Sequence, residues 1–233
     1  RISWLLPTSF YTEATMAVLN SAGTTTYSFR SDESSAIHGG MPIERQVRGA
    51  GDMLYVPRVA TSVDLTGTQT LLMGVSGAFG PNSSGSGART QIYGADLYWK
   101  WKSPTAHQGF PFVAFQGEAL ARRYDAALRD AEATPPPTLP SESLRDRGVY
   151  AQIQWGIRPM LVAGVRADFA HGDEARYPIL VAPEGVNRSR YSTNLTWFPS
   201  EYSKFRAQYN YDHRTRIGND HSLLLQFEFL LGA

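Results

Sequence analysis

Apolar and polar side chains alternate one by one along most of this chain, and the alternation is clearest near its C-terminal end. In residues 204–212, Phe205, Tyr209 and Tyr211 alternate with polar or charged side chains. Residues 222–231 repeat the pattern, with leucine or phenylalanine at every second position. Because a strand turns successive side chains to opposite faces of a sheet, these residues predict a hairpin with one apolar, aromatic face and one polar face.

The same alternation recurs in nine earlier segments, most of them bounded by residues typical of turns. The segments are 1–6, 9–19, 54–65, 69–80, 90–102, 109–124, 147–157, 160–170 and 187–198. Together with the final hairpin they predict about eleven strands, with no convincing helix and no sequence repeat. We therefore expect an all-β protein.

The connections between these strands are expected to alternate in length. Short connections are predicted at 7–8, 66–68, 103–108, 158–159 and 199–201, and longer ones at 20–50, 81–88, 125–146, 171–186 and 213–219. Short turns on one side and long loops on the other are typical of outer-membrane barrels. A sandwich with Greek-key connections has no reason to sort its loops this way. The pattern predicts an antiparallel transmembrane β-barrel of about 12 strands, with short periplasmic turns and long extracellular loops.

Two features favour lipid, rather than a protein core, against the apolar face. All five tryptophans are predicted on that face near short turns, as an aromatic girdle at one membrane interface: Trp4, Trp99, Trp101, Trp155 and Trp197. The other face carries too many charges for a dry interior, because unpaired buried charges are costly. The residues predicted to line a wet or salt-bridged lumen are Asp96, Lys100, Lys102, Glu118, Arg122, Arg166, Asp168, Arg190, Lys204, Arg206 and Glu228.

Composition agrees with this class and excludes several others. The 233 residues are enough for a single domain. A hydrophobic content of 42% suits a barrel, because only alternate residues of its strands face lipid. The formal net charge of +1 gives no electrostatic reason to expect nucleic acid. The chain has no cysteine, hence no disulfide or cysteine metal site, and no apolar run of about 18 residues that would predict a transmembrane helix.

Strand counting predicts a longer native polypeptide. The first and the last predicted strands both run toward the short-turn side, whereas a closed antiparallel barrel normally has an even number of strands. One ascending strand is therefore expected before Arg1, so that residues 1–233 form a single barrel domain shortened at its N-terminus. The C-terminus is expected to be clipped as well, because Leu231-Gly232-Ala233 lacks the terminal aromatic residue usual in bacterial barrels.

Strand and turn motifs carry a family resemblance over most of the chain. The motifs are Leu54-Tyr55-Val56-Pro57-Arg58, Ala78-Phe79-Gly80-Pro81-Asn82, Ile92-Tyr93-Gly94-Ala95-Asp96-Leu97-Tyr98, Leu195-Thr196-Trp197-Phe198-Pro199-Ser200-Glu201 and Gln226-Phe227-Glu228-Phe229-Leu230-Leu231-Gly232-Ala233. They resemble Gram-negative outer-membrane proteins of the group often labelled zinc-regulated or TonB-dependent receptor-like. The resemblance implies a porin-like barrel without a plug domain. Because these motifs are not catalytic signatures, it implies the fold more than the function.

Two sets of polar residues are candidate sites, and each has a second interpretation. The lumen charges form either a solute path or an interlocked salt-bridge network, since a barrel of about twelve strands lies between filled and open ones. His171, His213 and His221 fall at long-loop ends of the last four strands, where they could converge with Asp173 on a metal, because imidazole suits zinc. The alternative is that they are solvated loop histidines.

The function predicted from these features is a porin-like channel in the bacterial outer membrane. It would allow passive or gated passage of small polar or ionic solutes, with weak ion selectivity because the lumen charges nearly balance. The alternatives are a structural or partner-binding barrel that acts through loops 20–50 and 125–146, or a metal-uptake receptor. The expected partners are outer-membrane lipid and lipopolysaccharide, small polar solutes and, in the second interpretation, a protein on the long loops.

We expect no enzymatic activity and no cofactor. The pairs Asp212-His213 and Asp220-His221 lie where omptin-like proteases carry their Asp and His residues, but such pairs are common by chance. The outward positions of the predicted strands carry no histidine of the kind that outer-membrane phospholipases use. No residue is therefore predicted to be catalytic.

Overall fold

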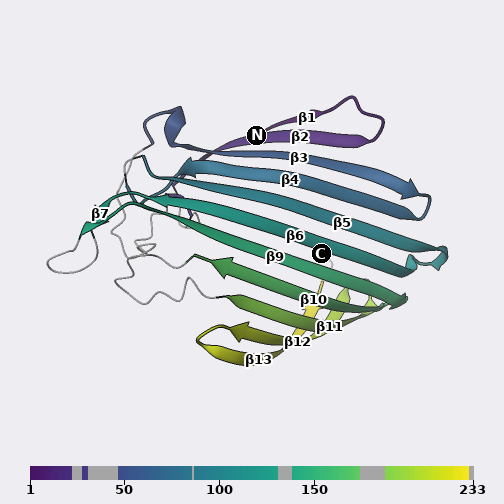
Figure 1. Cartoon of the computed structure of the whole chain (residues 1–233). Coiled ribbons are helices and arrows are strands. Elements are labelled where there is room, and N and C mark those ends of the chain that lie inside the picture. Colours follow the sequence, from purple (N-terminus) through teal and green to yellow (C-terminus); the bar gives the residue numbers. More distant parts are fainter. Residues whose placement is uncertain (23–27, 31–46, 86, 131–137, 174–186, 231–233) are drawn as a thin grey trace.

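The computed structural model of the chain describes residues 1–22, 28–30, 47–85, 87–130, 138–173 and 187–230. Its main feature is one antiparallel sheet of eleven strands (Figure 1). In sheet order these are β1 (Ile2–Leu5), β2 (Tyr11–Asn20), β3 (Met53–Thr66), β4 (Gln69–Pro81), β5 (Arg89–His107), β6 (Phe110–Ala126), β9 (Glu142–Arg158), β10 (Leu161–Gly172), β11 (Arg188–Ser200), β12 (Ser203–Arg214) and β13 (Gly218–Phe229). The predicted all-β fold is confirmed.

The remaining elements are short and lie in the connections. Among the described residues, the 3-10 turn η2 (Ala50–Asp52) precedes β3. Strands β7 (Arg129–Asp130) and β8 (Thr138–Leu139) pair only with each other. Consequently β6 pairs directly with β9, and every other strand of the sheet pairs with its neighbour in the chain.

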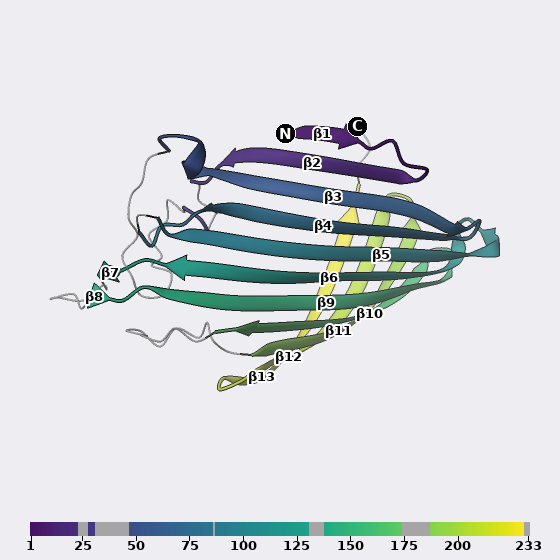
Figure 2. The same cartoon turned by 45° about the horizontal axis from the view of Figure 1, so that its top comes forward.

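The sheet is strongly curled rather than flat. Strands β11 to β13 turn away from the plane of β3 to β9 and pass behind them (Figure 2). Strands β1 and β13 end the sheet order, and within the described residues they are not paired with each other. The described sheet therefore has two edges, at β1 and at β13.

Strand register keeps one set of side chains on each face of the sheet. Val165 of β10 lies opposite Ile153 of β9 and Thr193 of β11. Its neighbour in sequence, Arg166, lies opposite Gln152 and so belongs to the other face. The period of two that the sequence predicts is thus maintained across the strand pairs, and it defines an apolar face and a polar face.

The apolar face exposes its large side chains. Fractional exposures between 46% and 78% are found at positions spread over the sheet, namely Val75, Ile153, Val165, Leu195, Leu225 and Phe227. The charged side chains of the other face are more shielded, and the Asp212 side chain, for example, is 13% exposed. This shielding indicates that the polar face is the inner, concave face of the curl. The sheet therefore has the reverse of a water-soluble protein's usual arrangement, in which apolar side chains are covered and charged ones exposed.

The turn predicted at 103–108 is shorter in the structure than expected. Strand β5 continues to His107, and the chain reverses at Gln108 and Gly109, whose φ angles are 52° and 84°. Pro104 lies between Lys102 and His107, where the ladder is interrupted, so no ladder N–H is needed at this position. Trp99 and Trp101, on β5, consequently lie farther from this turn than predicted. Trp101 nevertheless lies directly opposite Gln69, beside the short turn between β3 and β4.

Two connections predicted to be long are shorter in the structure. Strand β12 reaches Arg214 and β13 begins at Gly218, so that only three residues connect them. The polar residues there resembled a loop, yet they pair in the ladder, as His213 does with Asn219. The strict alternation of short and long connections is therefore wrong at this hairpin. The predicted loop 125–146 is shortened at both ends, by β6 and by β9.

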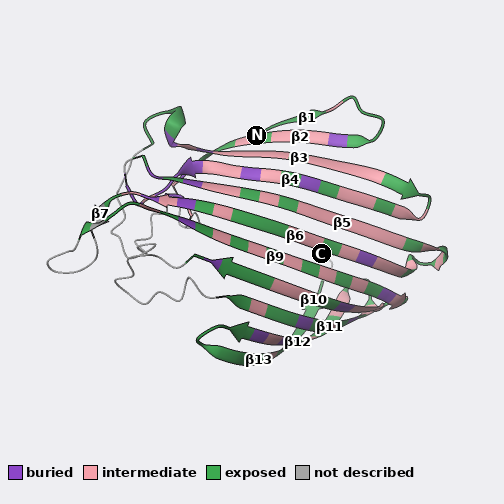
Figure 3. Ribbon diagram, viewed as in Figure 1, coloured by how far each residue is buried: buried purple, intermediate pink, exposed green. Residues whose placement is uncertain are grey.

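Buried residues gather at the end of the sheet that carries the long loops (Figure 3). Tyr124, Ala126 and Leu144 form a cluster there. Phe29 is also buried and packs close to Gly80, where an added Cβ would lie 3.1 Å from its ring. The core is thus a cap at one end of the polar face rather than a layer along the whole sheet.

The opposite end of the polar face is closely packed at Gly156. A Cβ added to Gly156 of β9 would overlap the ring of Phe112, which lies directly opposite on β6. It would also lie 2.9 Å from the ring of Phe110, which packs against Phe112 with ring centroids 5.3 Å apart. Gly148 of the same strand differs, because only the carbonyl oxygen of Phe169 lies within 4 Å of its added Cβ, at 3.9 Å.

We predict that Gly156→Ala destabilises the fold by about 1–3 kcal/mol, because both phenylalanine rings must move. Gly148→Ala is the matched control, and its effect should stay within about 0.5 kcal/mol. The measurement is urea-induced unfolding followed by tryptophan fluorescence. Equal losses of unfolding free energy in the two variants would contradict the packing described here.

Candidate functional site: the charged face of the sheet

The polar face carries the charged residues that the sequence predicts to line a lumen. The strand registers place all of them on this one face: Asp96, Lys100, Lys102, Glu118, Arg122, Arg166, Asp168, Arg190, Lys204, Arg206 and Glu228. They come from β5, β6 and β10 to β13, which the curl of the sheet brings around one interior. That solutes pass along this face stays a prediction.

A row of polar residues crosses the middle of this face from strand to strand. Each member lies directly opposite the next, and we call the row the central belt: Asp96, Glu118, Tyr150, Asp168, Arg190 and Asp212. Like charges directly opposite each other, as at Asp96 and Glu118, are unfavourable. The belt therefore depends on cations that reach it from adjacent positions.

Arg58 supplies one of these cations by reaching across a whole strand. Its guanidinium on β3 donates two hydrogen bonds to Asp96 on β5, with N–O distances of 2.5 and 2.9 Å. The intervening strand β4 contributes Gly74 at this point, and a Cβ there would overlap the guanidinium and lie 2.8 Å from the Asp96 carboxylate. The absence of a side chain at Gly74 is what permits this bidentate pair.

Among the described residues, four further ion pairs on the polar face have N–O distances of 2.8 Å or less. Three join residues that lie directly opposite on neighbouring strands, and the fourth joins residues two apart on β10; the pairs are Arg122–Asp146, Arg190–Asp212, Lys204–Glu228 and Arg166–Asp168. Their N–O distances lie between 2.5 and 2.8 Å. Since isolated exposed pairs stabilise by less than about 1 kcal/mol, their main effect is to hold charge at fixed positions.

Tyr150 connects the central belt to Arg166 and Gln116. The Arg166 guanidinium lies over the Tyr150 ring, 3.9 Å from its centroid. The Tyr150 hydroxyl accepts a hydrogen bond of 2.9 Å from Gln116. Arg166 is therefore held both by a cation–π contact and by Asp168.

Toward the short turns the same face becomes more basic. Lys100 lies over the Phe112 ring at 5.0 Å, and Lys102 follows it on β5. Arg206 of β12 lies opposite Thr196 and Gln226, neither of which carries charge. We call Lys100, Lys102 and Arg206 the basic end of the polar face.

A hollow of about 360 Å³ opens on the polar face beside the central belt. Its lining includes Glu118, Tyr150, Asp168, Arg190 and Asp212 of the belt, together with Arg188 and Arg214. At about 30 Å³ of liquid volume per water, such a space suits a small polar solute with its hydration water. The hollow is the candidate binding position on the predicted solute path.

Described residues 28–30 of the predicted loop 20–50 contribute to this face, which no periodic pattern in the sequence indicates. The Ser28 hydroxyl accepts a hydrogen bond of 2.9 Å from Arg122, and the Ser28 carbonyl accepts one of 2.5 Å from the Thr90 hydroxyl. The carbonyl of Phe29 accepts a bond from the backbone N–H of Ser83. Residues 28–30 therefore lie against the wall at its long-loop end. Most of the rest of loop 20–50 lies outside the described residues.

The predicted metal site is not assembled in the described part of the chain. His171 pairs with Asn187, His213 with Asn219 at 2.6 Å, and His221 with the Tyr209 hydroxyl at 2.6 Å. These are three separate hydrogen bonds. The registers direct all three imidazoles to the apolar face, so the expectation that outward positions of the strands carry no histidine is wrong. Among the described residues, no group of three His, Cys, Asp or Glu side chains is arranged to hold a metal ion.

The five tryptophans lie on the apolar face, as the registers of their strands show. Trp155 and Trp197 are both about half exposed, at 52% and 51%. The Trp197 ring stacks on Phe205, whose ring contacts Phe227 in turn. An aromatic girdle at a membrane interface stays a prediction for Trp4, Trp99, Trp101, Trp155 and Trp197.

We predict that the Arg58–Asp96 pair depends on Gly74. A double-mutant cycle of Arg58→Gln and Asp96→Asn should give a coupling energy of about 0.5–3 kcal/mol, and Gly74→Ala should reduce it by forcing the guanidinium aside. The Lys204–Glu228 pair, whose residues lie directly opposite, is the control and should keep its coupling in the Gly74→Ala background. An unchanged Arg58–Asp96 coupling in that background would contradict the role given to Gly74.

Comparison with known proteins gives a distant relative but no family. No family model matches the chain. A protein of Aquifex aeolicus (strain VF5), described only as uncharacterized, is 27% identical to it over 253 aligned residues, which cover 100% of this chain and 49% of that protein. The chain thus spans about half the length of this curated relative. In the described part of the chain, no helix is long and apolar enough to cross a membrane.

Proposed function

We propose that this chain forms the wall of an outer-membrane β-barrel that acts as a porin-like channel for small polar or ionic solutes. The observation that carries the proposal is the distribution of side chains over the two faces. Large apolar residues are exposed over the whole apolar face, while charged residues are paired on the face inside the curl. A lipid bilayer outside and water inside would suit both faces at once.

The extent of the apolar face argues against an ordinary water-soluble surface. Monomeric soluble proteins rarely expose contiguous apolar patches larger than a few hundred Å². Here exposed leucine, valine, tryptophan and phenylalanine side chains follow the strands from Trp4 on β1 to Phe229 on β13. Lipid would cover this surface without a second protein layer.

A membrane wall also requires that the edges of the sheet be paired. Backbone N–H and C=O groups left open in hydrocarbon cost several kcal/mol each, and β1 and β13 are edge strands in the described sheet. We propose that both edges acquire hydrogen-bonding partners in the membrane, which closes the curled sheet into a barrel.

The polar face supports a water-filled path rather than a dry core. The central belt, the basic end and the hollow of about 360 Å³ form a continuous charged surface inside the curl. Positive and negative groups are mostly paired, so the path would discriminate little by charge, with some preference for anions at the basic end.

A second candidate function is a barrel whose interior is occluded and whose loops bind a partner. The observation that favours it is the docking of residues 28–30 on the polar face, together with the ion pairs that cross that face. In this case the interlocked side chains would fill the barrel and conduct little. Measurements of conductance separate the two functions.

We predict that arginine is tolerated unequally at adjacent positions of β9. Ile153→Arg should cost about 2–4 kcal/mol of folding free energy in a bilayer, because it places a charge against lipid near mid-membrane. The neighbouring change Gln154→Arg should cost much less, because it adds to the charged face. Urea titration of the protein refolded into phosphatidylcholine liposomes measures both; equal costs would contradict the assignment of the faces to lipid and water.

We predict steady stepwise currents from the purified protein in planar bilayers, with weak ion selectivity. The double variant Lys100→Gln/Lys102→Gln should lower the anion-to-cation permeability ratio by less than about tenfold, because the interaction of two unit charges in water is only about 1 kcal/mol at 4 Å. Arg216→Gln, in the β12–β13 turn, is the matched control and should leave the ratio unchanged. Protein that inserts but carries no current would favour the occluded barrel, and strong selectivity would contradict the balanced lumen.

A further inference from the structure

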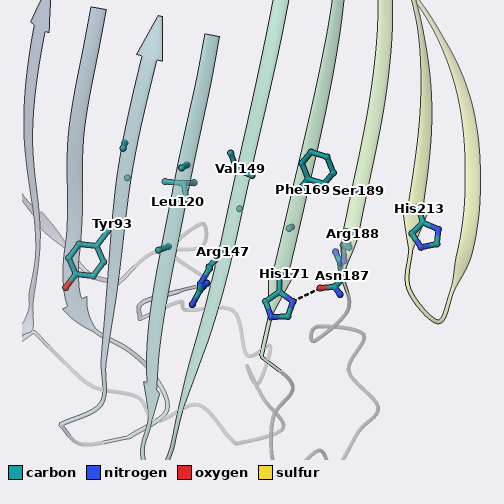
Figure 4. Close-up of a pocket in the computed structure, with 16 residues that line it drawn as sticks. Tyr93, Leu120, Arg147, Val149, Phe169, His171, Asn187, Arg188, Ser189 and His213 are labelled. Atoms are coloured by element: carbon teal, nitrogen blue, oxygen red, sulfur yellow. Dashed lines mark hydrogen bonds between the residues drawn. The ribbon is translucent and has the colours of Figure 1, made fainter.

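The apolar face is hollowed near its long-loop end. A groove of about 780 Å³ crosses β5 to β12 there (Figure 4). Its floor includes the small side chains of Ala95, Ala119 and Ala121, which lie between the larger side chains of Tyr93 and Phe169. Ala119 lies directly opposite Ala95, and Ala121 directly opposite Tyr93, so the alanines form one depression across β5 and β6. An extended hydrocarbon chain fits such a depression.

Basic side chains border this groove on the side of the long loops. Arg147 and His171 lie directly opposite each other at its rim. Two residues before Arg147 on β9, and on the same face, Arg145 lies directly opposite Arg123 of β6. Two like charges at directly opposite positions repel each other, so this rim is arranged for a negatively charged group.

The acidic residues nearby compensate only part of this charge. Asp125 pairs with Arg123 at 3.0 Å. The Asp173 carboxylate accepts a hydrogen bond of 3.1 Å from the backbone N–H of Arg145. With Arg147 and Arg89, which lies opposite Asp125, the described residues on this part of the apolar face include four arginines and two carboxylates. These described residues therefore carry a net positive charge.

We infer that the groove binds an anionic phospholipid, with an acyl chain on the alanine floor and the negatively charged phosphate at Arg145 and Arg147. This inference rests on the proposed function, because only a barrel in a membrane presents its apolar face to lipid. The planar guanidinium matches phosphate oxygens in a bidentate manner. The hydrogen bond from His171 Nδ1 to the Asn187 amide oxygen fixes the imidazole beside Arg147.

The charge of the rim is what selects this occupant over a neutral lipid. A neutral or zwitterionic lipid would cover the alanine floor equally well but would leave the arginines of the rim uncompensated at the membrane surface. Basic residues at such a surface contribute about a factor of five each to the binding of anionic lipid. The site therefore requires both parts of the ligand, an acyl chain and a phosphate.

The test uses the whole chain, reconstituted in phosphatidylcholine and titrated with dioleoyl phosphatidic acid, with bound lipid counted by native mass spectrometry. Arg145→Gln/Arg147→Gln should weaken binding about thirtyfold. Ala119→Leu/Ala121→Leu, which fills the floor, should also weaken it. The control Arg158→Gln, at the short-turn end, should bind phosphatidic acid like the parent protein.

Three outcomes would overturn the lipid site. The first is equal affinity for phosphatidic acid and phosphatidylcholine. The second combines two results: inorganic phosphate competes for the site as effectively as the lipid does, and Ala119→Leu/Ala121→Leu has no effect on binding. The site would then recognise phosphate alone. The third is an unchanged affinity in Arg145→Gln/Arg147→Gln. Flotation with phosphatidylcholine liposomes separates these results from failure of the proposed function: protein that does not float overturns both, whereas protein that floats without preferring phosphatidic acid overturns only the lipid site.

Discussion

The register between neighbouring strands is the constraint on which the rest of this structure depends. Because side chains alternate with a period of two, a slip of one residue would exchange the faces of a strand and send Ile153 inward and Gln154 outward. The pairing of β6 with β5 and with β9 is continuous over most of its length. These three strands fix the faces of the sheet, and the adjoining strands propagate them to both edges.

The charged face illustrates how register and side-chain chemistry act together. Register alone places Asp96 opposite Glu118, which is unfavourable, and the structure compensates by bringing Arg58 across β4. This ion pair requires glycine at position 74. Because Gly74 of β4 has no side chain, there is room for the pair between Arg58 of β3 and Asp96 of β5. The charges of the polar face are in this way held by geometry, although each pair contributes little stability by itself.

Much of the fold was predictable from the sequence, since alternation is a local property that each strand displays by itself. The eleven strands and their two faces follow from it. The exceptions have physical causes: Pro104 gives a turn signal within β5, and the polar residues around His213 resemble a loop although they pair in a ladder. The contact of Ser28 with Arg122 joins residues far apart in sequence and has no periodic signal.

The candidate site was predictable only in part, because alternation is local to each strand whereas the contacts of the site join different strands. The face on which each lumen residue lies follows from alternation, but its partner depends on register between strands. Nothing in the sequence shows that Arg58 reaches Asp96 over Gly74, or that the central belt joins residues of six strands. The histidines illustrate the limit: their places near strand ends suggested convergence, yet register turns His171, His213 and His221 toward separate neighbours.

In the proposed barrel, the apolar face contacts lipid and the polar face contacts water. The chain has no cysteine, so nitroxide labels can be placed singly at residues 149–155 of β9 in the protein reconstituted in liposomes. We expect accessibility to molecular oxygen to peak at 149, 151, 153 and 155, and accessibility to a water-soluble nickel chelate to peak at 150, 152 and 154. Odd-numbered positions shielded from both reagents would mean that the apolar face packs against protein, and that result would contradict the account.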